Sequence, residues 1–154
     1  MIKILACGKV KDQSLKSLID EYVKRIKHYH NIEIIDTNDQ KIVANDSYKH
    51  IKDLEAKDLL AKIKDSDFVV VLDLKGRELD SIELSNMIDR WLSNGRDIVF
   101  VIGGSLGLGE EVLMRADYHL CLSKLTFLHQ MSKLILLEQI YRSFKILHHE
   151  TYHK

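Results

Sequence analysis

Short apolar runs alternate along this chain with segments whose apolar residues recur every three or four positions. The apolar runs predict buried strands over residues 2–7, 32–35, 68–74, 97–102 and 118–122. The periodic segments predict helices over residues 14–26, 48–63, 81–91, 109–115 and 130–147. Because parallel neighbours need a crossover between them, this order predicts an α/β fold with an open, mostly parallel sheet and helices on both faces.

Local signals set some of the expected boundaries. Gly76 is expected to end the third strand, and Ser81 is expected to be the N-cap of the helix that Asn94 and Gly95 close. The polar stretch 37–47 is expected to be a mobile loop. A length of 154 residues fits a single domain, 1–154.

Charge and hydropathy limit the class of protein. The 23 Lys and Arg residues balance 23 Asp and Glu residues, so the chain lacks the field of a general nucleic-acid binder and any RNA contact must be local. From Lys124 onward, five basic residues face two acidic ones. No apolar run approaches the roughly 18 residues of a membrane helix, which favours a cytoplasmic location without membrane contact. Cys7 and Cys121 are then expected to be reduced, buried thiols.

Three loops follow strands at the edge where open α/β sheets bind ligands: residues 72–77, 102–109 and 122–127. The second holds Gly103, Gly104, Gly107 and Gly109, which let backbone amides approach a ligand. Their spacing matches neither GxGxxG nor the phosphate-binding GxxxxGK[ST] loop, so a dinucleotide oxidoreductase and a P-loop nucleotidase are poorly supported. A purely structural turn stays open as an alternative.

Polar residues occur in the third loop and on the last helix, and each pair has two possible roles. Ser123 and Thr126 either bind a polar cofactor tail or cap the helix. Glu138 and Arg142 either form a helical ion pair or belong to a site. The aromatic and basic ending suits RNA, and its histidines lack a matching Cys/His set, so no metal is predicted. The broad apolar surface of residues 131–147 suggests contact with the core and with a second subunit.

Several motifs together resemble the ribosomal RNA large subunit methyltransferase H family of the SPOUT superfamily. They are VLDLKG at 71–76, FVIGGSLG at 100–107, LSKLTF at 122–127, HQM at 129–131, EQIYR at 138–142 and YHK at 152–154. The resemblance covers essentially the whole chain. It implies a C-terminal trefoil knot, bound S-adenosyl-L-methionine, a homodimer, and methyl transfer to N3 of a pseudouridine in 23S ribosomal RNA. The balanced charge further suggests that the substrate is this RNA within the assembled ribosome. No metal is implied.

The resemblance also assigns roles by motif position. The expected cofactor-binding residues are Leu72, Gly103, Leu122, Ser123, Lys124, Leu125, Thr126 and Phe127. Candidates for RNA positioning or proton removal are His129, Arg142, Tyr152 and His153, and Lys133, Lys145 and Lys154 are expected to bind RNA. In the family, the tail of one subunit lies near the cofactor of the other.

Three positions depart from the family pattern. The family usually has proline where this chain has Leu128, arginine where it has Lys133, and often glycine where it has His149. Weaker preorganisation of the same reaction is expected. A SPOUT methyltransferase acting on another RNA, such as transfer RNA, and an inactive ribosome-binding module remain as alternatives.

Overall fold

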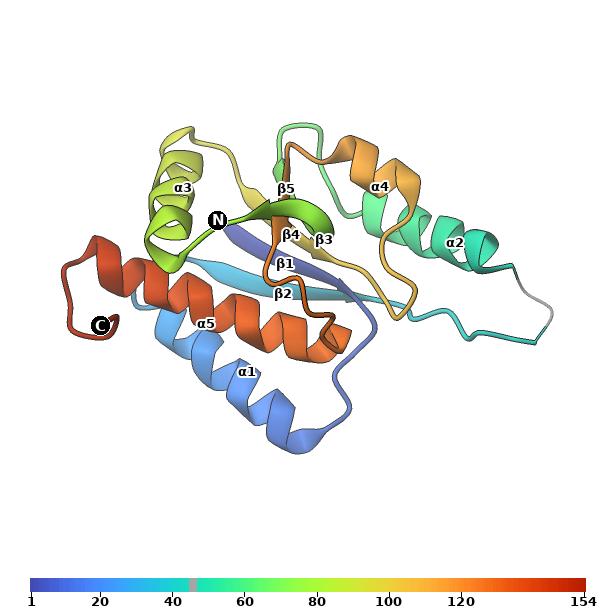
Figure 1. The fold of residues 1–154 in the computed structure, drawn as a ribbon, viewed down its shortest axis with the longest axis horizontal. Coiled ribbons are helices and arrows are strands. Elements are labelled where there is room, and N and C mark those ends of the chain that lie inside the picture. The colour runs from blue at the N-terminus through green and yellow to red at the C-terminus, as the bar shows by residue number, and fades with distance from the viewer. Residues whose placement is uncertain (45–46) are drawn as a thin grey trace.

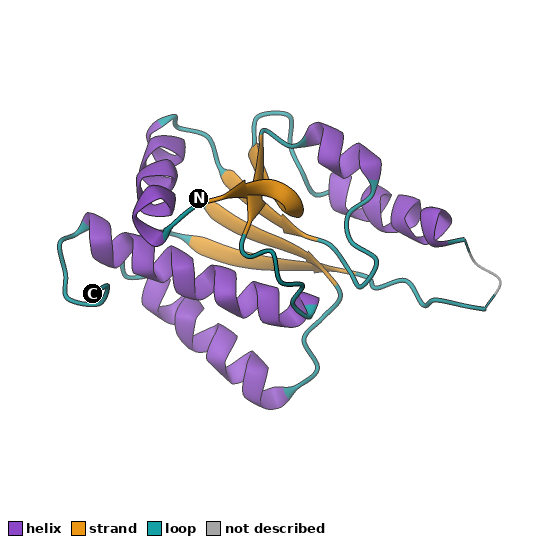
Figure 2. Ribbon diagram, in the orientation of Figure 1, coloured by secondary structure: helices purple, strands orange, loops and turns teal. Residues whose placement is uncertain are grey.

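The computed structural model describes residues 1–44 and 47–154. Strands and helices alternate along the chain, as Figure 2 shows. In order they are β1 (Ile2–Cys7), α1 (Gln13–Ile26), β2 (Ile32–Thr37), α2 (Tyr48–Leu60), β3 (Phe68–Glu78), α3 (Ser81–Ser93), β4 (Ile98–Ile102), α4 (Glu110–Arg115), β5 (Tyr118–Cys121) and α5 (His129–Leu147). The predicted α/β alternation is confirmed.

The five strands form one sheet in the order β2-β1-β4-β3-β5, and every neighbouring pair is parallel. In the centre, Ile2 of β1 pairs with Ile32 of β2 on one side and with Ile98 of β4 on the other. Because the strands are parallel, all their carboxyl ends reach the same edge. Figure 1 shows that α5 starts near this edge and that the C-terminus lies at the opposite end of the molecule.

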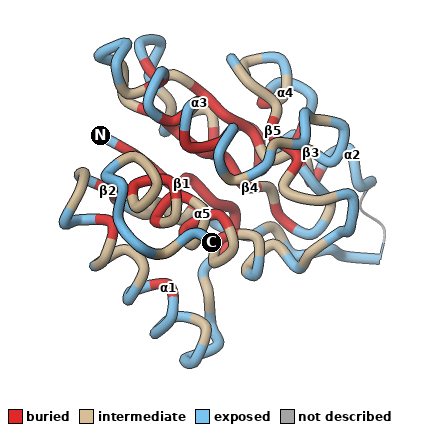
Figure 3. Tube along the Cα trace, turned by 60° about the vertical axis from the view of Figure 1, so that its left-hand side comes forward, coloured by how far each residue is buried: buried red, intermediate tan, exposed pale blue. Residues whose placement is uncertain are grey.

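Helices cover both faces of the sheet, as predicted. On one face, Ile4 and Phe100 pack in the larger core cluster with α1, α3 and α5. On the other face, Leu5 and Val101 pack with residues of α2 and α4. Alternate residues of each strand thus pack on opposite faces of the sheet. Because helices cover both faces, the strands are continuous apolar runs in the sequence. Figure 3 shows this buried centre in red.

Gly76 does not end β3, contrary to the prediction. β3 pairs with β5 in two registers, first Leu72 with Leu120 and then Arg77 with Leu120, and the residues between form a bulge. A β-carbon on Gly76 would lie 2.7 Å from the backbone of His119. Gly76 therefore does not end the strand. It lets the backbones of β3 and β5 approach each other closely, a common reason for a glycine inside a strand.

The N-cap of α3 is Asp80, so the assignment to Ser81 was wrong. Asp80 Oδ1 accepts from the Glu83 amide at 2.7 Å, and Glu83 Oε2 accepts from the Asp80 amide at 2.9 Å. This reciprocal capping box satisfies two amides at once, which a hydroxyl one position later does not. Ser81 instead donates to Gln139 Oε1 at 2.7 Å and ties α3 to α5.

The remaining expectations fall close to the observed boundaries. Thr37 is the last residue of β2, so the loop predicted over residues 37–47 begins one residue later than expected; its residues 45–46 lie outside the described residues. Cys7 and Cys121 are buried free thiols, as predicted. Among the described residues, no helix combines the length and apolarity needed to cross a membrane.

Candidate functional site

A cavity of about 570 Å³ lies at the carboxyl ends of the strands. Its walls come from the three segments singled out in the sequence: residues 72–74 within β3, residues 102–108 from the end of β4, and residues 122–123 and 125–128 after β5. His129 and Ser132 of α5 complete the lining. The parallel topology brings these loops together, and the volume falls in the range of small-molecule sites.

Glycine makes the second loop compact enough to form a wall. A β-carbon on Gly103 would lie 2.8 Å from the carbonyl carbon of Gly107, so any side chain there would push the loop apart. Gly107 itself has a φ of 82°, a conformation that favours glycine. The glycines therefore let the backbone of this loop pack closely and leave it bare of side chains at these positions.

The third loop supplies most of the expected cofactor-binding residues. Leu122, Ser123, Leu125, Thr126 and Phe127 all line the cavity, as do Leu72 and Gly103 from the other loops. Lys124 does not line it; its exposed ammonium lies 3.5 Å from Glu78.

Neither hydroxyl of the third loop caps α5. Leu128 occupies the N-cap position without a side-chain hydrogen bond, and Ser123 Oγ accepts from the Leu125 amide at 3.1 Å. Ser123 therefore stabilises the turn of the loop, and Thr126, which also lines the cavity, is left available to a ligand.

Two titratable side chains line the cavity wall, His129 and Asp73. His129 lines the cavity, and its buried Nδ1 has no hydrogen-bond partner within residues 1–44 and 47–154. Asp73 accepts from the Lys75 amide and contacts His119 Nδ1, both at 2.9 Å. Partial burial opposes these contacts, yet they hold the pKa of Asp73 below its usual range. Asp73 thus presents a stable negative charge.

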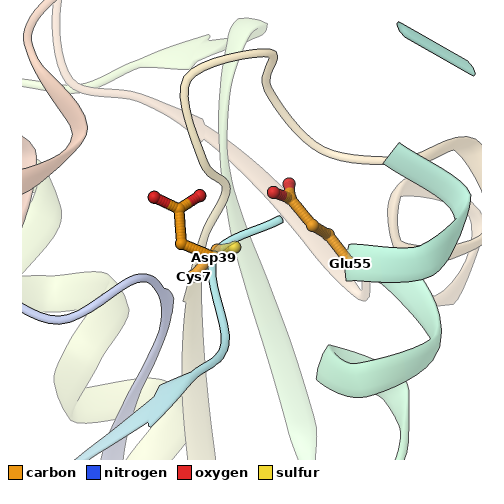
Figure 4. Close-up of side chains that lie close together, drawn as sticks. All are labelled: Cys7, Asp39 and Glu55. Atoms are coloured by element: carbon orange, nitrogen blue, oxygen red, sulfur yellow. The ribbon is translucent and has the colours of Figure 1, made fainter. Parts of the chain in front are cut away.

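Behind the glycine wall lies a polar group formed by Cys7, Asp39 and Glu55, whose ligand-type atoms all lie within 4.8 Å of one another. Figure 4 shows Glu55 reaching from α2 toward the other two. Burial, reinforced by the nearby carboxylates, raises the pKa of the Cys7 thiol to about 12, so the thiol keeps its proton at neutral pH. A β-carbon on Gly104 would lie 3.0 Å from Glu55 Oε2. We interpret this group as hydrogen-bonded support for the cavity wall.

The C-terminal tail forms a second cluster at the far end of α5. Arg142 Nη2 lies 2.5 Å from Glu138 Oε1, which also accepts from the Tyr152 hydroxyl at 3.0 Å. His153 Nδ1 lies 3.4 Å from Arg142 Nη1 and borders a separate cavity of about 450 Å³. His129 and Arg142 are thirteen positions apart on the same helix, about 20 Å along its axis. Within one chain, the predicted tail residues therefore do not meet the cavity.

The chain is similar to known proteins over nearly its whole length. The family description "Predicted SPOUT methyltransferase" matches residues 1–153. A ribosomal RNA large subunit methyltransferase H 1 of Clostridium perfringens (strain SM101 / Type A) is 48% identical over 157 residues, which cover 99% of each chain. A ribosomal RNA large subunit methyltransferase H of Clostridium botulinum (strain Langeland) is 49% identical with the same coverage.

The chain belongs to the ribosomal RNA large subunit methyltransferase H family. Among solved structures, it resembles a probable methylase family protein from Haemophilus influenzae Rd KW20, with a TM-score of 0.56 and 14% identity over 99% of this chain and 70% of that chain. At that identity the likeness supports the fold alone. The resemblance inferred from the sequence motifs is thus confirmed at the level of the family.

The structure corrects one residue assigned to RNA by the methyltransferase H pattern. Lys133 is buried, with 2% exposure, and its ammonium lies 2.6 Å from Asp36 Oδ1. It sits on the face of α5 that packs into the domain, so it pairs with a carboxylate of β2 and is not available to a phosphate. Lys145 pairs with Glu150, and Lys154 is exposed at the end of the chain.

Asp73 is an acidic residue of the cavity wall that the sequence motifs did not assign to the site. It stands within the VLDLKG motif of the methyltransferase H family, at the point where the buried part of β3 gives way to a bulge. A carboxylate directly after an apolar run, at the ligand-binding edge of a parallel sheet, is the signal that would have identified it.

Proposed function

We propose that this chain transfers a methyl group from S-adenosyl-L-methionine to N3 of a pseudouridine in 23S ribosomal RNA, in the cytoplasm. The observation that carries the proposal is the cavity at the strand ends, whose walls are the family motifs of residues 71–76, 100–107 and 122–127. The full-length relatives named ribosomal RNA large subunit methyltransferase H support the choice of substrate.

The cavity fits such a cofactor. Leu72, Leu125 and Phe127 offer apolar surface to an adenine ring, and the loop at Gly103 offers close backbone approach. The Asp73 carboxylate offers an acceptor and a charge that suits a cationic ligand. When bound, S-adenosylmethionine supplies a methyl group already activated by a sulfonium centre. The protein's part is then to align the RNA base, exclude water and accept the N3 proton.

We propose that a histidine accepts the N3 proton. Burial, with hydrogen bonds to Tyr22 and Glu138, raises the pKa of Tyr152, so its hydroxyl remains a donor at neutral pH. Arg142 stays charged beside Glu138. These two residues therefore position RNA, whereas His129 at the cavity and His153 in the tail are the candidates for the acceptor.

A shared site in a homodimer would unite the two clusters. Exposed apolar side chains lie around the cavity and the start of α5: Leu74, Leu125, Leu128 and Met131. They support burial against a second copy, because apolar surface of this kind favours association.

We also propose that the segment after β5 is threaded to form the family's trefoil knot. Pulling the unfolded chain by its ends would then give a contour length shorter than 154 extended residues.

The function is tested on ribosomes from a strain that lacks this gene. Wild-type protein with radiolabelled S-adenosylmethionine is expected to label 23S RNA, and mass spectrometry is expected to find the new methyl group on a pseudouridine. Gly103→Ala, which places a β-carbon 2.8 Å from backbone, is expected to lose cofactor binding in calorimetry. Label in transfer RNA would point to the other SPOUT substrate class, and no cofactor binding by the wild type would point to an inactive ribosome-binding module.

The form of the substrate can be tested in the same assay. The balanced charge of the chain gives little long-range attraction to bare RNA, so assembled particles are expected to be methylated far better than protein-free 23S RNA. Equal rates on both would contradict this part of the proposal.

A further inference from the structure

One carboxylate oxygen joins the helix to the tail. Glu138 Oε1 accepts from Arg142 Nη2 at 2.5 Å, one turn along α5, and from the Tyr152 hydroxyl at 3.0 Å, from beyond the end of the helix. The other oxygen, Oε2, accepts from Gln139 Nε2 at 2.7 Å. Both oxygens of this side chain are therefore engaged, and two of the three donors belong to residues expected to face RNA.

The chain returns to Glu138 through a defined turn. After α5, the Glu150 amide donates to the Lys145 carbonyl and the His149 amide to the Ile146 carbonyl, which is the Schellman pattern. Glu150 then accepts from Lys145 and from the Tyr29 hydroxyl. This turn reverses the chain direction and brings Tyr152 back over α5.

The cluster around Glu138 is tighter than an ordinary helical ion pair. The Arg142 guanidinium lies 4.7 Å from the centre of the Tyr152 ring, and the Tyr152 hydroxyl lies 3.5 Å from that of Tyr22 on α1. The side chains of Glu138 and Arg142 are only 21% and 24% exposed. Partial burial strengthens their attraction and limits the number of conformations that either can adopt.

An ion pair of the same spacing on α1 provides the contrast. Glu21 and Arg25 are also four positions apart, at 2.9 Å, but their side chains are 46% and 43% exposed and the Glu21 carboxylate receives no tail residue. A pair of that kind contributes little to stability. What distinguishes Glu138 is the additional Tyr152 hydroxyl.

From this geometry we propose that Glu138 is a positioning residue for RNA, acting through Arg142 and Tyr152. The inference rests on the proposed function. The guanidinium of Arg142 has five N–H donors in one plane. When one edge of the guanidinium is held by the Glu138 carboxylate, the orientation of that plane is set, and the remaining donors can bind a phosphate. Tyr152, kept neutral by burial, holds the tail over α5. Without Glu138, both groups would remain in the chain but would sample many orientations.

The experiment compares Glu138→Ala, Glu138→Gln and the matched control Glu21→Gln. For Glu138→Ala we expect kcat/KM for ribosomes to fall about tenfold or more, while the dissociation constant for S-adenosylmethionine changes by less than about twofold. Glu138→Gln keeps an acceptor for Tyr152 without the charge, so an intermediate loss is expected. Glu21→Gln is expected to match the wild type. Adding Tyr152→Phe to Glu138→Ala is expected to cost little more, because both changes remove the same contact.

Hydrogen exchange of the tail amides gives a readout that does not require activity. Glu138→Ala is expected to speed exchange from residue 149 to residue 154 and to leave the strands unchanged. Unchanged tail exchange, or a loss of cofactor affinity as large as the loss of activity, would overturn the inference. Tighter RNA binding by Glu138→Ala would also overturn it, since Glu138 would then mask Arg142. If the wild type transfers no methyl group, the proposed function fails, and tail exchange still decides whether Glu138 positions the tail.

Discussion

His149 illustrates how one residue can strain an otherwise regular motif. It has a φ of 56° at the end of α5, in the left-handed region where a β-carbon is unfavourable. The hydrogen bonds of the Schellman turn are nevertheless made. The family's frequent glycine at this position therefore has a conformational reason, and this chain retains the turn at some cost in stability.

Replacing His149 by glycine is expected to stabilise the protein by about 0.5–1 kcal/mol, because relief of the strain exceeds the added entropy of the unfolded chain. Urea denaturation measures the change. Gly95→His supplies the reciprocal control: Gly95 follows the C-cap of α3 with a φ of 71° and open space around its missing β-carbon. It is expected to lose a similar amount. A loss of stability in His149→Gly would show that side-chain contacts outweigh the backbone.

Glu55 makes stability depend on pH. It is 4% exposed, and burial raises the pKa of its carboxyl above the usual 4.5 despite the hydrogen bond from the Gln40 amide. The folded state thus holds a proton that the unfolded state has released, and stability falls as the pH rises from 4.5 through the folded-state pKa. Glu55→Gln keeps an acceptor without a charge. Its stability relative to wild type is expected to increase as the pH rises from about 4.5 through the folded-state pKa of Glu55.

Glu21, which is exposed, is a control whose pKa shift has the opposite sign. A hydrogen bond from Arg25 lowers the pKa of Glu21, so its small contribution is present at neutral pH and is lost in acid. Glu21→Gln is therefore expected to become slightly less stable, relative to wild type, as the pH rises. The same trend in both variants would contradict burial as the cause at Glu55.

Among the elements, α5 connects the two candidate clusters. Its first turn borders the cavity, its middle packs between α1 and α3, and its last turn carries the tail. Two helices of the same chain thus account for much of the broad apolar surface that the sequence assigned in part to a second subunit. The exposed remainder lies at the start of the helix, where Leu128 and Met131 are 63% and 41% exposed.

Leu128→Pro is expected to stabilise the start of α5 by about 0.4–1 kcal/mol. Leu128 has a φ of −55°, within the range of proline, and its carbonyl, which accepts from Ser132, is retained. Urea denaturation and calorimetry with S-adenosylmethionine measure stability and cofactor affinity, and both are expected to rise. Ser132→Pro removes the donor of that hydrogen bond and is expected to cost about 3 kcal/mol. Equal effects of the two prolines would refute a role for the N-cap conformation.

In the whole molecule, the separation of cavity and tail is the main constraint on mechanism. The cavity lies at the carboxyl ends of the strands, and the tail lies at the other end of α5 (Figure 1). One rigid chain does not bring Arg142 to a base at its own cavity. A two-fold pair solves the problem if each tail serves the partner's cavity, which is the arrangement we propose.

Mixed dimers test this arrangement. One chain carries Gly103→Ala and the other lacks residues 152–154, and each variant alone is expected to be inactive. In a dimer purified by two different tags, one intact cavity meets one intact tail, so about half of the wild-type activity is expected to return. Cofactor binding by the truncated chain alone is expected to stay normal. Inactive mixed dimers would indicate that each tail serves its own cavity.

The sequence determined the layers and the family of this protein. Apolar periodicity fixed which segments become strands and helices, because burial favours the same pattern in any α/β domain. Motif spacing identified the three loops and the family, and glycines marked where backbone approaches closely. These signals are local, so they can be read without knowing which strands are neighbours.

Packing decided the rest. Lys133 reads as a basic residue suited to RNA, but the rotation of α5 buries it against Asp36. Gly76 reads as a strand end, but the neighbouring β5 lets the strand continue through a bulge. Glu138 reads as a simple helical pair, and only the return of the tail brings Tyr152 to the same oxygen. Each of these outcomes depends on contacts between residues far apart in the chain, which no local pattern encodes.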